Sequence, residues 1–164
     1  MTVRAYIGIG SNLNDPAARV QAAFGALQRL PDTRLAARSS LYRSKPMGPA
    51  NQPDYVNAVA ALDTRMPAAE LLQALARIED REGRERGGIH WGPRILDLDL
   101  LLYGSQCIAT PTLTVPHPGM HERDFVLVPL AEIAGDLDIP GHGPLSTLTS
   151  CCGQHDLVRL VAAS

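Results

Sequence analysis

Hydrophobic and polar positions along the chain follow two periods, one of about two residues and one of about 3.6 residues. A period of two predicts a strand, because successive strand side chains point to opposite faces of a sheet. Alternation of this kind, or a short apolar run bounded by turn residues, predicts strands at 3–9, 34–43, 55–62, 95–103 and near 106–109 or 112–115. A segment rich in proline and glycine, 44–53, separates the second strand from the third.

The helical period predicts three helices. The first is expected to begin after Asp15, a capping candidate, with Pro16 in its first turn, and to run up to Pro31. The second is expected from near Pro67 to Gly83, with its apolar residues on one face. The third is expected over 122–134, whereas the chain beyond Pro140 has no clear pattern.

The order of these elements, β-α-β-β-α-β, predicts the fold class. It suits an α+β protein with a ferredoxin-like sandwich, in which helices flank a mainly antiparallel sheet. A mostly parallel βαβ sheet is the competing architecture. It is less favoured because the second and third strands follow one another without a helix between them. A length of 164 residues predicts a single domain over 1–164.

Composition and charge exclude several classes of function. The 15 Lys and Arg residues against 17 Asp and Glu residues give a net charge of −2, which provides no basic field for nucleic acid or an anionic membrane. No apolar run reaches the roughly 18–20 residues of a membrane span, and the N-terminus does not resemble a signal peptide. We therefore expect a cytoplasmic protein. The three cysteines match neither a disulfide framework nor a zinc motif, so no zinc site is expected.

The strand at 95–103 carries two carboxylates on one face. The Cα atoms of Asp97 and Asp99 should lie roughly 6.6 Å apart, while the opposite face is expected to be wholly apolar, with Leu96, Leu98, Leu100 and Leu102. Like charges side by side on a strand repel each other, and divalent cations such as Mg²⁺ would relieve that repulsion. A half-solvated amphipathic strand has the same pattern, so both interpretations remain open.

Cationic residues flank this strand on both sides along the chain. Arg84, Arg86 and Arg94 precede it together with His90 and Trp91, and four further polar residues follow it, namely Thr114, His117, His121 and Arg123. Guanidinium groups match phosphate oxygens, so the clusters favour a polyphosphate bound with Mg²⁺. A solvated surface of structural ion pairs is the alternative. Neither a Walker loop nor a Rossmann turn is present in context.

Five blocks of the sequence together are typical of one family. They are HWGPRILDLDLL at 90–101, AYIGIGSNL at 5–13, SSLYR at 39–43, QPDYVN at 52–57 and LTVPH at 113–117. In these blocks, which follow the family's order across 3–134, the chain resembles 6-hydroxymethyl-7,8-dihydropterin pyrophosphokinase. The resemblance implies a ferredoxin-like, monomeric, cytoplasmic enzyme of folate biosynthesis. Such an enzyme transfers the β,γ-pyrophosphoryl group of ATP to the hydroxymethyl oxygen of the pterin and releases AMP.

The resemblance also implies roles for individual residues. Asp97 and Asp99 would bind two Mg²⁺ ions, and Arg84 and Arg94 would act with them in catalysis by neutralising charge on the transferring group. The implied ATP-binding residues are Arg86, Trp91, Leu100, Thr114, His117 and Arg123. The implied pterin-binding residues are Gly10, Ser44, Met47, Tyr55, Asn57 and Phe125.

The chemistry of three of these residues suits a pterin. The Asn57 amide can donate to and accept from the edge of the heterocycle, and Tyr55 and Phe125 could stack on its flat ring. Core packing for the two aromatic residues, and a turn for Asn57, are the interpretations without the resemblance. Ser44 stands where the family commonly has threonine, and Ala76 where relatives often have glutamine, which puts a contact of the second helix with ATP in doubt.

Two further expectations complete the interpretation. The polar, glycine-rich segment 84–94 is expected to be a mobile loop that closes over bound ligands. A non-catalytic nucleotide-binding regulatory module on the same fold is the alternative function, because fold alone does not fix function. Glu79 matches the family, but the sequence does not distinguish a role in the site from an ion pair on the helix face.

Overall fold

An antiparallel sheet of six strands forms the centre of the computed structural model, which describes residues 2–11, 15–44, 54–83, 96–151 and 157–160. Its strands are β1 (Val3–Ser11), β2 (Thr33–Arg38), β3 (Tyr42–Ser44), β4 (Tyr55–Thr64), β5 (Asp97–Tyr103) and β10 (Val158–Arg159). They lie in the order β10-β3-β4-β1-β5, with β2 also paired to β4.

The connections match the predicted fold class. Helix α1 (Pro16–Gln28) links β1 to β2, and these two strands lie on opposite sides of β4. Helix α2 (Ala68–Gly83) links β4 to β5, which pairs with the other edge of β1. This split βαβ arrangement is that of a ferredoxin-like fold. The prediction of an α+β protein with an antiparallel sheet is confirmed, and the parallel alternative is wrong, because every pair of described strands in this sheet is antiparallel.

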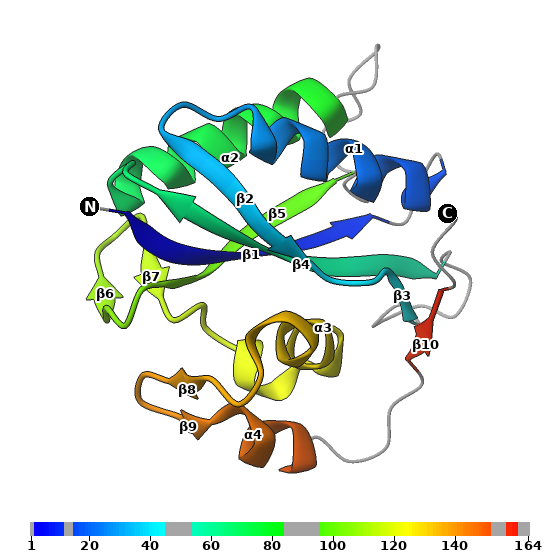
Figure 1. Ribbon diagram of the computed structural model, residues 1–164, viewed down its shortest axis with the longest axis vertical. Helices are drawn as coiled ribbons and strands as arrows, with labels where there is room; N and C mark the ends of the chain where they lie inside the picture. The colour runs from blue at the N-terminus through cyan, green and yellow to red at the C-terminus, as the bar shows by residue number, and fades with distance from the viewer. Residues whose placement is uncertain (1, 12–14, 45–53, 84–95, 152–156, 161–164) are drawn as a thin grey trace.

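Helices cover both faces of the sheet (Figure 1). Helices α1 and α2 lie on one face, where Phe24 and Leu71 are buried in a large apolar cluster. Helices α3 (Asp124–Ala134) and α4 (Leu145–Cys151) lie on the other face, where Leu127 and Leu130 belong to a second cluster. The sheet therefore has an apolar core on each side.

Short elements flank helix α3 along the chain. The hairpin of β6 (Ile108–Ala109) with β7 (Thr114–Val115) and a 3-10 helix, η1 (Met120–Glu122), precede α3, and the hairpin of β8 (Asp138–Ile139) with β9 (Gly143–Pro144) follows it. Both positions predicted for one short strand thus form strands, which pair with each other. The third helix is shorter at its start than predicted, and β9, α4 and β10 lie in the tail beyond Pro140 that had no clear pattern.

Two local predictions are wrong. The strand predicted over 34–43 is divided into β2 and β3 at Ser39, a buried residue whose backbone N–H donates to the Val59 carbonyl (2.9 Å) and whose Oγ accepts from the Val59 N–H (2.8 Å). Asp15 does not cap α1 with its side chain; it adopts a left-handed conformation with φ 62°. Pro16 begins the helix, as predicted.

The apolar face predicted for β5 is also wrong at its end. The register of β5 against β1 shifts between Tyr6 and Ile7, which are paired with Leu102 and Leu100, so Leu101 has no partner in the ladder. A bulge of this kind reverses the alternation of the side chains that follow it. Leu98 and Leu100 therefore face α1 and α2, whereas Leu102 belongs to the cluster on the α3 side.

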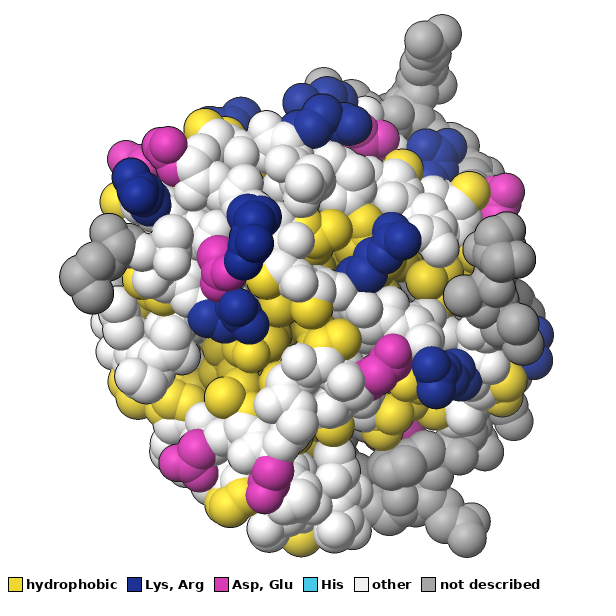
Figure 2. All heavy atoms as spheres, in the orientation of Figure 1, with side chains coloured by type: hydrophobic (Ala, Val, Ile, Leu, Met, Phe, Trp, Pro, Cys, Tyr) yellow, Lys and Arg dark blue, Asp and Glu magenta, His cyan; other side chains and the backbone are white. Residues whose placement is uncertain are grey.

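One face of the molecule carries charges of both signs. On the face drawn in Figure 2, Lys and Arg side chains lie among Asp and Glu side chains and are not gathered into one block. Among the described residues, no helix is both long enough and apolar enough to cross a membrane.

Candidate active site

One row of residues crosses four strands on the α3 face of the sheet. Asp97 on β5 is paired with Gly10 on β1, Gly10 with Asn57 on β4, and Asn57 with Tyr42 on β3. Cross-strand partners in a sheet point to the same face. Adjacent strands lie about 4.8 Å apart, so Asp97 and Asn57 lie roughly 10 Å from each other on the two sides of Gly10.

Two glycines on β1 leave space in the middle of this face. A Cβ atom at Gly10 would lie 3.1 Å from the Asn57 Nδ2 atom, and one at Gly8 would lie 3.3 Å from a methyl group of Leu101. Contacts this short would force the Asn57 amide or the leucine side chain to shift. The absence of a side chain at Gly10 therefore keeps the sheet surface between Asp97 and Asn57 open.

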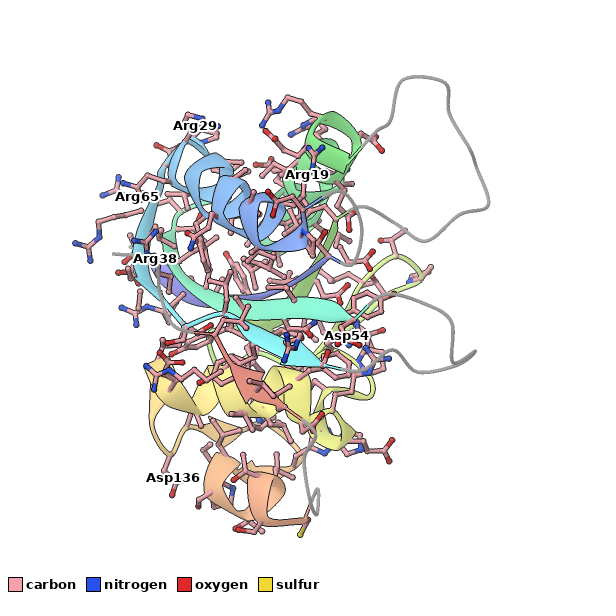
Figure 3. The ribbon with its side chains drawn as sticks, turned by 90° about the vertical axis from the view of Figure 1, so that its right-hand side faces the viewer. Arg19, Arg29, Arg38, Asp54, Arg65 and Asp136 are labelled. Carbon is pink, nitrogen blue, oxygen red and sulfur yellow. The ribbon has the colours of Figure 1, made fainter. Side chains whose placement is uncertain are left out.

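A cavity of about 240 Å³ lies over this open surface. It is closed from the α3 side by Arg123, Phe125 and Val126, and its other lining residues come from the sheet, namely Gly8, Ile9, Gly10, Ser44, Tyr55, Asn57, Ala58, Asp97 and Asp99. In Figure 3, Asp54, which directly precedes β4, lies on the opposite side of the molecule from Arg65, which directly follows it. The cavity is at the Asp54 end of this strand.

Asn57 has a fixed orientation at one side of the cavity. The buried Ser44 hydroxyl donates to the Asn57 Oδ1 atom at 2.6 Å. This bond turns the Nδ2 group toward the space above Gly10, where it can donate to a ligand. Burial, together with the negative charge of Asp97, raises the pKa of the nearby Tyr55 further above physiological pH.

Asp97 and Asp99 lie at the other side, on an edge strand held by two contacts. The backbone N–H of Leu98, between the two aspartates, donates to the Glu79 Oε2 atom of α2 at 2.8 Å. The carbonyl of Leu101 accepts from the backbone N–H of His117 at 3.0 Å. The second contact brings the His117 Nε2 atom to 3.9 Å from the Asp99 Oδ1 atom.

The two aspartates suit a magnesium–nucleotide complex. Mg²⁺ is usually bound by one or two carboxylates together with water and substrate phosphates, and not by a cage of protein ligands alone. Asp97 and Asp99 line the cavity together, and the Asp99 side chain is 44% exposed. Within the described ranges, no group of three or more His, Cys, Asp and Glu residues could hold a metal ion.

The structure brings together most of the described residues that the sequence proposed for the site. The cavity lining includes eight of them: Gly10, Ser44, Tyr55, Asn57, Asp97, Asp99, Arg123 and Phe125. The Arg123 guanidinium carbon is 5.9 Å from the centre of the Phe125 ring. His117 reaches the site through Asp99, as described above.

Other proposed residues lie elsewhere. Leu100 is 2% exposed, with its side chain in the core on the opposite face, and Thr114 is exposed on β7 outside the cavity lining. Five proposed residues, and the loop expected at 84–94, lie outside the described residues: Met47, Arg84, Arg86, Trp91 and Arg94.

Sequence reasoning missed one contributor to the site, Gly8, and left the role of a second, Glu79, undecided. Gly8 lines the cavity and makes room for Leu101, but an isolated glycine in a strand gives only a weak signal of close approach. Glu79 holds the backbone between the two aspartates. Its helical position was known, yet nothing in the sequence showed that α2 crosses the edge strand at this point.

Comparison with known proteins agrees with this geometry. Residues 6–135 match the family model described as 7,8-dihydro-6-hydroxymethylpterin-pyrophosphokinase. The chain is 48% identical over 158 residues to the 2-amino-4-hydroxy-6-hydroxymethyldihydropteridine pyrophosphokinase of Haemophilus influenzae, covering 96% of this chain and 98% of that protein. Its identity to the protein of the same name from Pseudomonas aeruginosa is 50% over 163 residues, covering 99% of this chain and all of that protein.

A solved structure with low sequence identity has the same fold. Wild-type Plasmodium falciparum HPPK-DHPS with pteroate superposes with a TM-score of 0.73 at 12% identity, over 92% of this chain. The chain spans only 42% of the length of that protein. At 12% identity, the similarity to this structure shows a shared fold and nothing more. The family itself is shown by the family model, which matches residues 6–135. The chain therefore belongs to the 7,8-dihydro-6-hydroxymethylpterin-pyrophosphokinase family.

Proposed function

We propose that this chain transfers the β,γ-pyrophosphoryl group of ATP to the hydroxymethyl oxygen of 6-hydroxymethyl-7,8-dihydropterin, giving AMP and the pterin diphosphate. The observation that carries the proposal is the shared cavity, which has an oriented amide at one side and two carboxylates at the other. This arrangement suits a substrate with a flat, polar ring at one end and a reacting alcohol near a phosphate chain at the other.

The pterin end consists of side chains on β3, β4 and α3. Asn57, held by Ser44, would recognise the pyrimidine-like edge of the ring with both a donor and an acceptor. Tyr55 and Phe125 would stack on the ring, and Gly10 would leave room for it. Met47 is proposed as a further pterin contact.

The phosphate end is proposed at Asp97 and Asp99, which would hold two Mg²⁺ ions. When bound there, these ions would neutralise phosphate charge and orient the substrate alcohol toward the β-phosphorus. Charged groups of this chain would supply the rest of the neutralisation: Arg84 and Arg94 on the transferring group, and Arg86, His117 and Arg123 on the nucleotide. Trp91 and Thr114 are proposed as uncharged contacts of the nucleotide, and Leu100, whose side chain lies in the core on the opposite face, would contact it through its backbone. Catalysis on this account comes mainly from positioning and charge.

We further propose that the protein acts as a monomer in the cytoplasm and that residues 1–164 form one domain. Its partners would be ATP and the reduced pterin alcohol, without nucleic acid or membrane. The net charge of −2, with charges of both signs interspersed on the face drawn in Figure 2, supports this set of small-molecule partners.

The test is AMP formation from ATP in the presence and absence of the pterin alcohol, with Mg²⁺ in both reactions. We expect AMP only when the pterin is present, and a fall of several orders of magnitude in Asp97→Ala and in Asp99→Ala, because the metal ions stabilise the charge that is transferred. Both variants should fold, since removing one of two like charges on a strand relieves repulsion. A regulatory module would bind the nucleotide but form no AMP, and this result would overturn the proposal.

A further inference from the structure

A single carboxylate in helix α3 holds the segment that leads into β3. Glu132 follows an apolar stretch of this helix, and its side chain is 26% exposed. Its carboxylate accepts hydrogen bonds from the Ser40 backbone N–H (2.9 Å to Oε2), the Ser40 hydroxyl (2.9 Å) and the Tyr42 hydroxyl (2.6 Å). Three donors from one short segment therefore converge on one charged acceptor, which is a strong arrangement of hydrogen bonds.

Strand β10 also contacts Ser40 and Tyr42. In β10, Arg159 is paired with Tyr42, and its Nε donates to the Ser40 Oγ atom at 3.0 Å. Its Nη2 atom lies 3.8 Å from the Glu132 Oε2 atom, and the next backbone N–H, that of Leu160, donates to the Leu41 carbonyl at 2.8 Å. Helix α3, the segment before β3 and β10 thus meet at Ser40, and Figure 1 shows β10 beside β3.

The electrostatics keep this junction in one protonation state. Burial alone would raise the pKa of Glu132, but hydrogen bonds from Tyr42 and Ser40 and the charge of Arg159 hold it below its ordinary value. Burial, followed by the bond to Glu132, raises the pKa of Tyr42 to about 12. At neutral pH, Glu132 is therefore a charged acceptor and Tyr42 a donor.

The junction lies next to the pterin end of the cavity. Tyr42 is directly opposite Asn57 in the sheet, and Ser44, two residues further along β3, holds the Asn57 amide. Two strand residues span roughly 6.6 Å, so a displacement at Tyr42 is transmitted over a short distance to the Ser44 hydroxyl. A displaced hydroxyl would release the Asn57 amide from its orientation.

We propose that Glu132, supported by Arg159, is a positioning residue for the substrate pocket, which holds β3 so that Ser44 can orient Asn57. The inference rests on the proposed function, because it takes the Asn57 side of the cavity as the pterin site. It separates two effects. Loss of the Glu132 contacts weakens binding of the pterin. Asp97 and Asp99 lie two strands away from Asn57, and the hydrogen bonds of β5 to Glu79 and His117 are unaffected.

Glu132→Gln is the first test, because glutamine keeps the size of the side chain and removes its charge. The KM for the pterin alcohol should rise roughly tenfold, as for the loss of one charged hydrogen bond, while the KM for ATP changes by less than about twofold. The NMR signals of the Asn57 side-chain NH₂ group in the ligand-free protein should move as well. Arg159→Gln should give a smaller rise in the pterin KM and a smaller shift of the Asn57 signals, because the Arg159 side chain is 66% exposed. This variant replaces Glu132→Gln as the test if Glu132→Gln does not fold.

Leu130→Val is the matched control, since it perturbs the same helix at a fully buried site in the second apolar cluster, and a leucine side chain forms none of the hydrogen bonds that hold Ser40 and Tyr42. It should lower the thermal midpoint but leave the pterin KM and the Asn57 signals unchanged. An equal rise in pterin KM for Leu130→Val, or unmoved Asn57 signals in both the Glu132 and Arg159 variants, would overturn the positioning role. Failure of the unaltered protein to form pterin-dependent AMP would instead overturn the proposed function, and the Asn57 signals would still decide whether Glu132 orients that amide.

Discussion

At the scale of single residues, the space over Gly10 determines what the sheet can bind. The backbone conformation at Gly10 is open to other residues, so the requirement is for room and not for a left-handed φ. A methyl group there would lie 3.1 Å from the Asn57 Nδ2 atom and occupy the surface between Asn57 and Asp97. The same glycine therefore affects both the shape of the cavity and the direction of its main donor.

Gly10→Ala is expected to weaken pterin binding about five- to tenfold, since the displaced amide loses roughly one hydrogen bond to the ligand. Calorimetric titration with the pterin alcohol measures the change. Gly25→Ala in α1 is the control, because its new methyl group would meet only the flexible end of Arg29, at 3.7 Å. Alanine at that helical position should stabilise the fold by about 0.5–1 kcal/mol. Unchanged pterin affinity in Gly10→Ala would contradict the assignment of this surface to the pterin.

At the scale of elements, the contact between α2 and β5 fixes the strand that carries both aspartates. Strand β5 lies at the edge of the sheet, where backbone N–H groups lack a neighbouring strand. The Glu79 carboxylate accepts from one of these groups, that of Leu98. A helix side chain thus takes the place of a strand partner between Asp97 and Asp99.

Glu79→Ala should therefore speed hydrogen exchange at the Leu98 amide and lower the free energy of unfolding by about 1–3 kcal/mol. It should also weaken binding of a Mg²⁺–ATP analogue, because the aspartates on either side lose their support. Asp80→Ala, at an exposed carboxylate on the same turn, should leave the exchange of Leu98 unchanged. If the Leu98 amide exchanges equally fast in the unaltered protein and in Glu79→Ala, the hydrogen bond does not hold the strand.

Helices and strands in which apolar residues recur at a regular spacing could be predicted from the sequence. Helices α1 and α2 and strands β1, β4 and β5 follow from apolar spacing together with proline and glycine at their ends. The division of 34–43 could not be predicted, because it depends on hydrogen bonds between Ser39 and Val59, 20 residues away. The bulge at Leu101 also escapes prediction, since the run of leucines is apolar on both faces and contains no signal for a change of side.

The candidate site was predictable to a similar extent. The alternation at Asp97 and Asp99 placed both carboxylates on one face, and the family resemblance supplied Asn57, Ser44 and Phe125. The role of Glu132 was not predictable, because its partners Ser40 and Arg159 come from parts of the chain 92 and 27 positions away. The pairing of β10 with β3 likewise involves a tail without a periodic pattern.

At the scale of the whole molecule, stability and binding depend on opposite ends of the sheet. Asp63 on β4 pairs with Arg4 on β1 (2.6 Å) and with Arg34 on β2 (3.0 Å), which joins three strands. Hydrogen bonds from Arg4 and then Arg34 hold the pKa of Asp63 below its ordinary value of 3.8. Asn57 lies six residues along β4 from this cluster, roughly 20 Å away.

The lowered pKa of Asp63 predicts how stability changes in acid. A carboxyl group whose pKa is lower in the folded state contributes stability above its unfolded pKa, and this contribution is lost as the pH falls through the folded value. Urea unfolding at pH 7 and at several pH values below 4 should show Asp63→Asn to be less stable than the unaltered protein at pH 7 but less sensitive to acid. Asp32→Asn removes the same charge near this end without breaking the described bridges, and its acid loss should match that of the unaltered protein. Identical acid sensitivity in Asp63→Asn would contradict the assignment.

The central claim is transfer of a pyrophosphoryl group, and the most direct measurement follows the phosphorus atoms of ATP. The protein is incubated with Mg²⁺, the pterin alcohol and ATP that carries a radioactive label on its β-phosphate, and the products are separated. The account predicts that the β label appears in the pterin diphosphate, with one unlabelled AMP formed for each labelled product. A β label retained in ADP would show transfer of a single phosphoryl group, and that result would contradict the account.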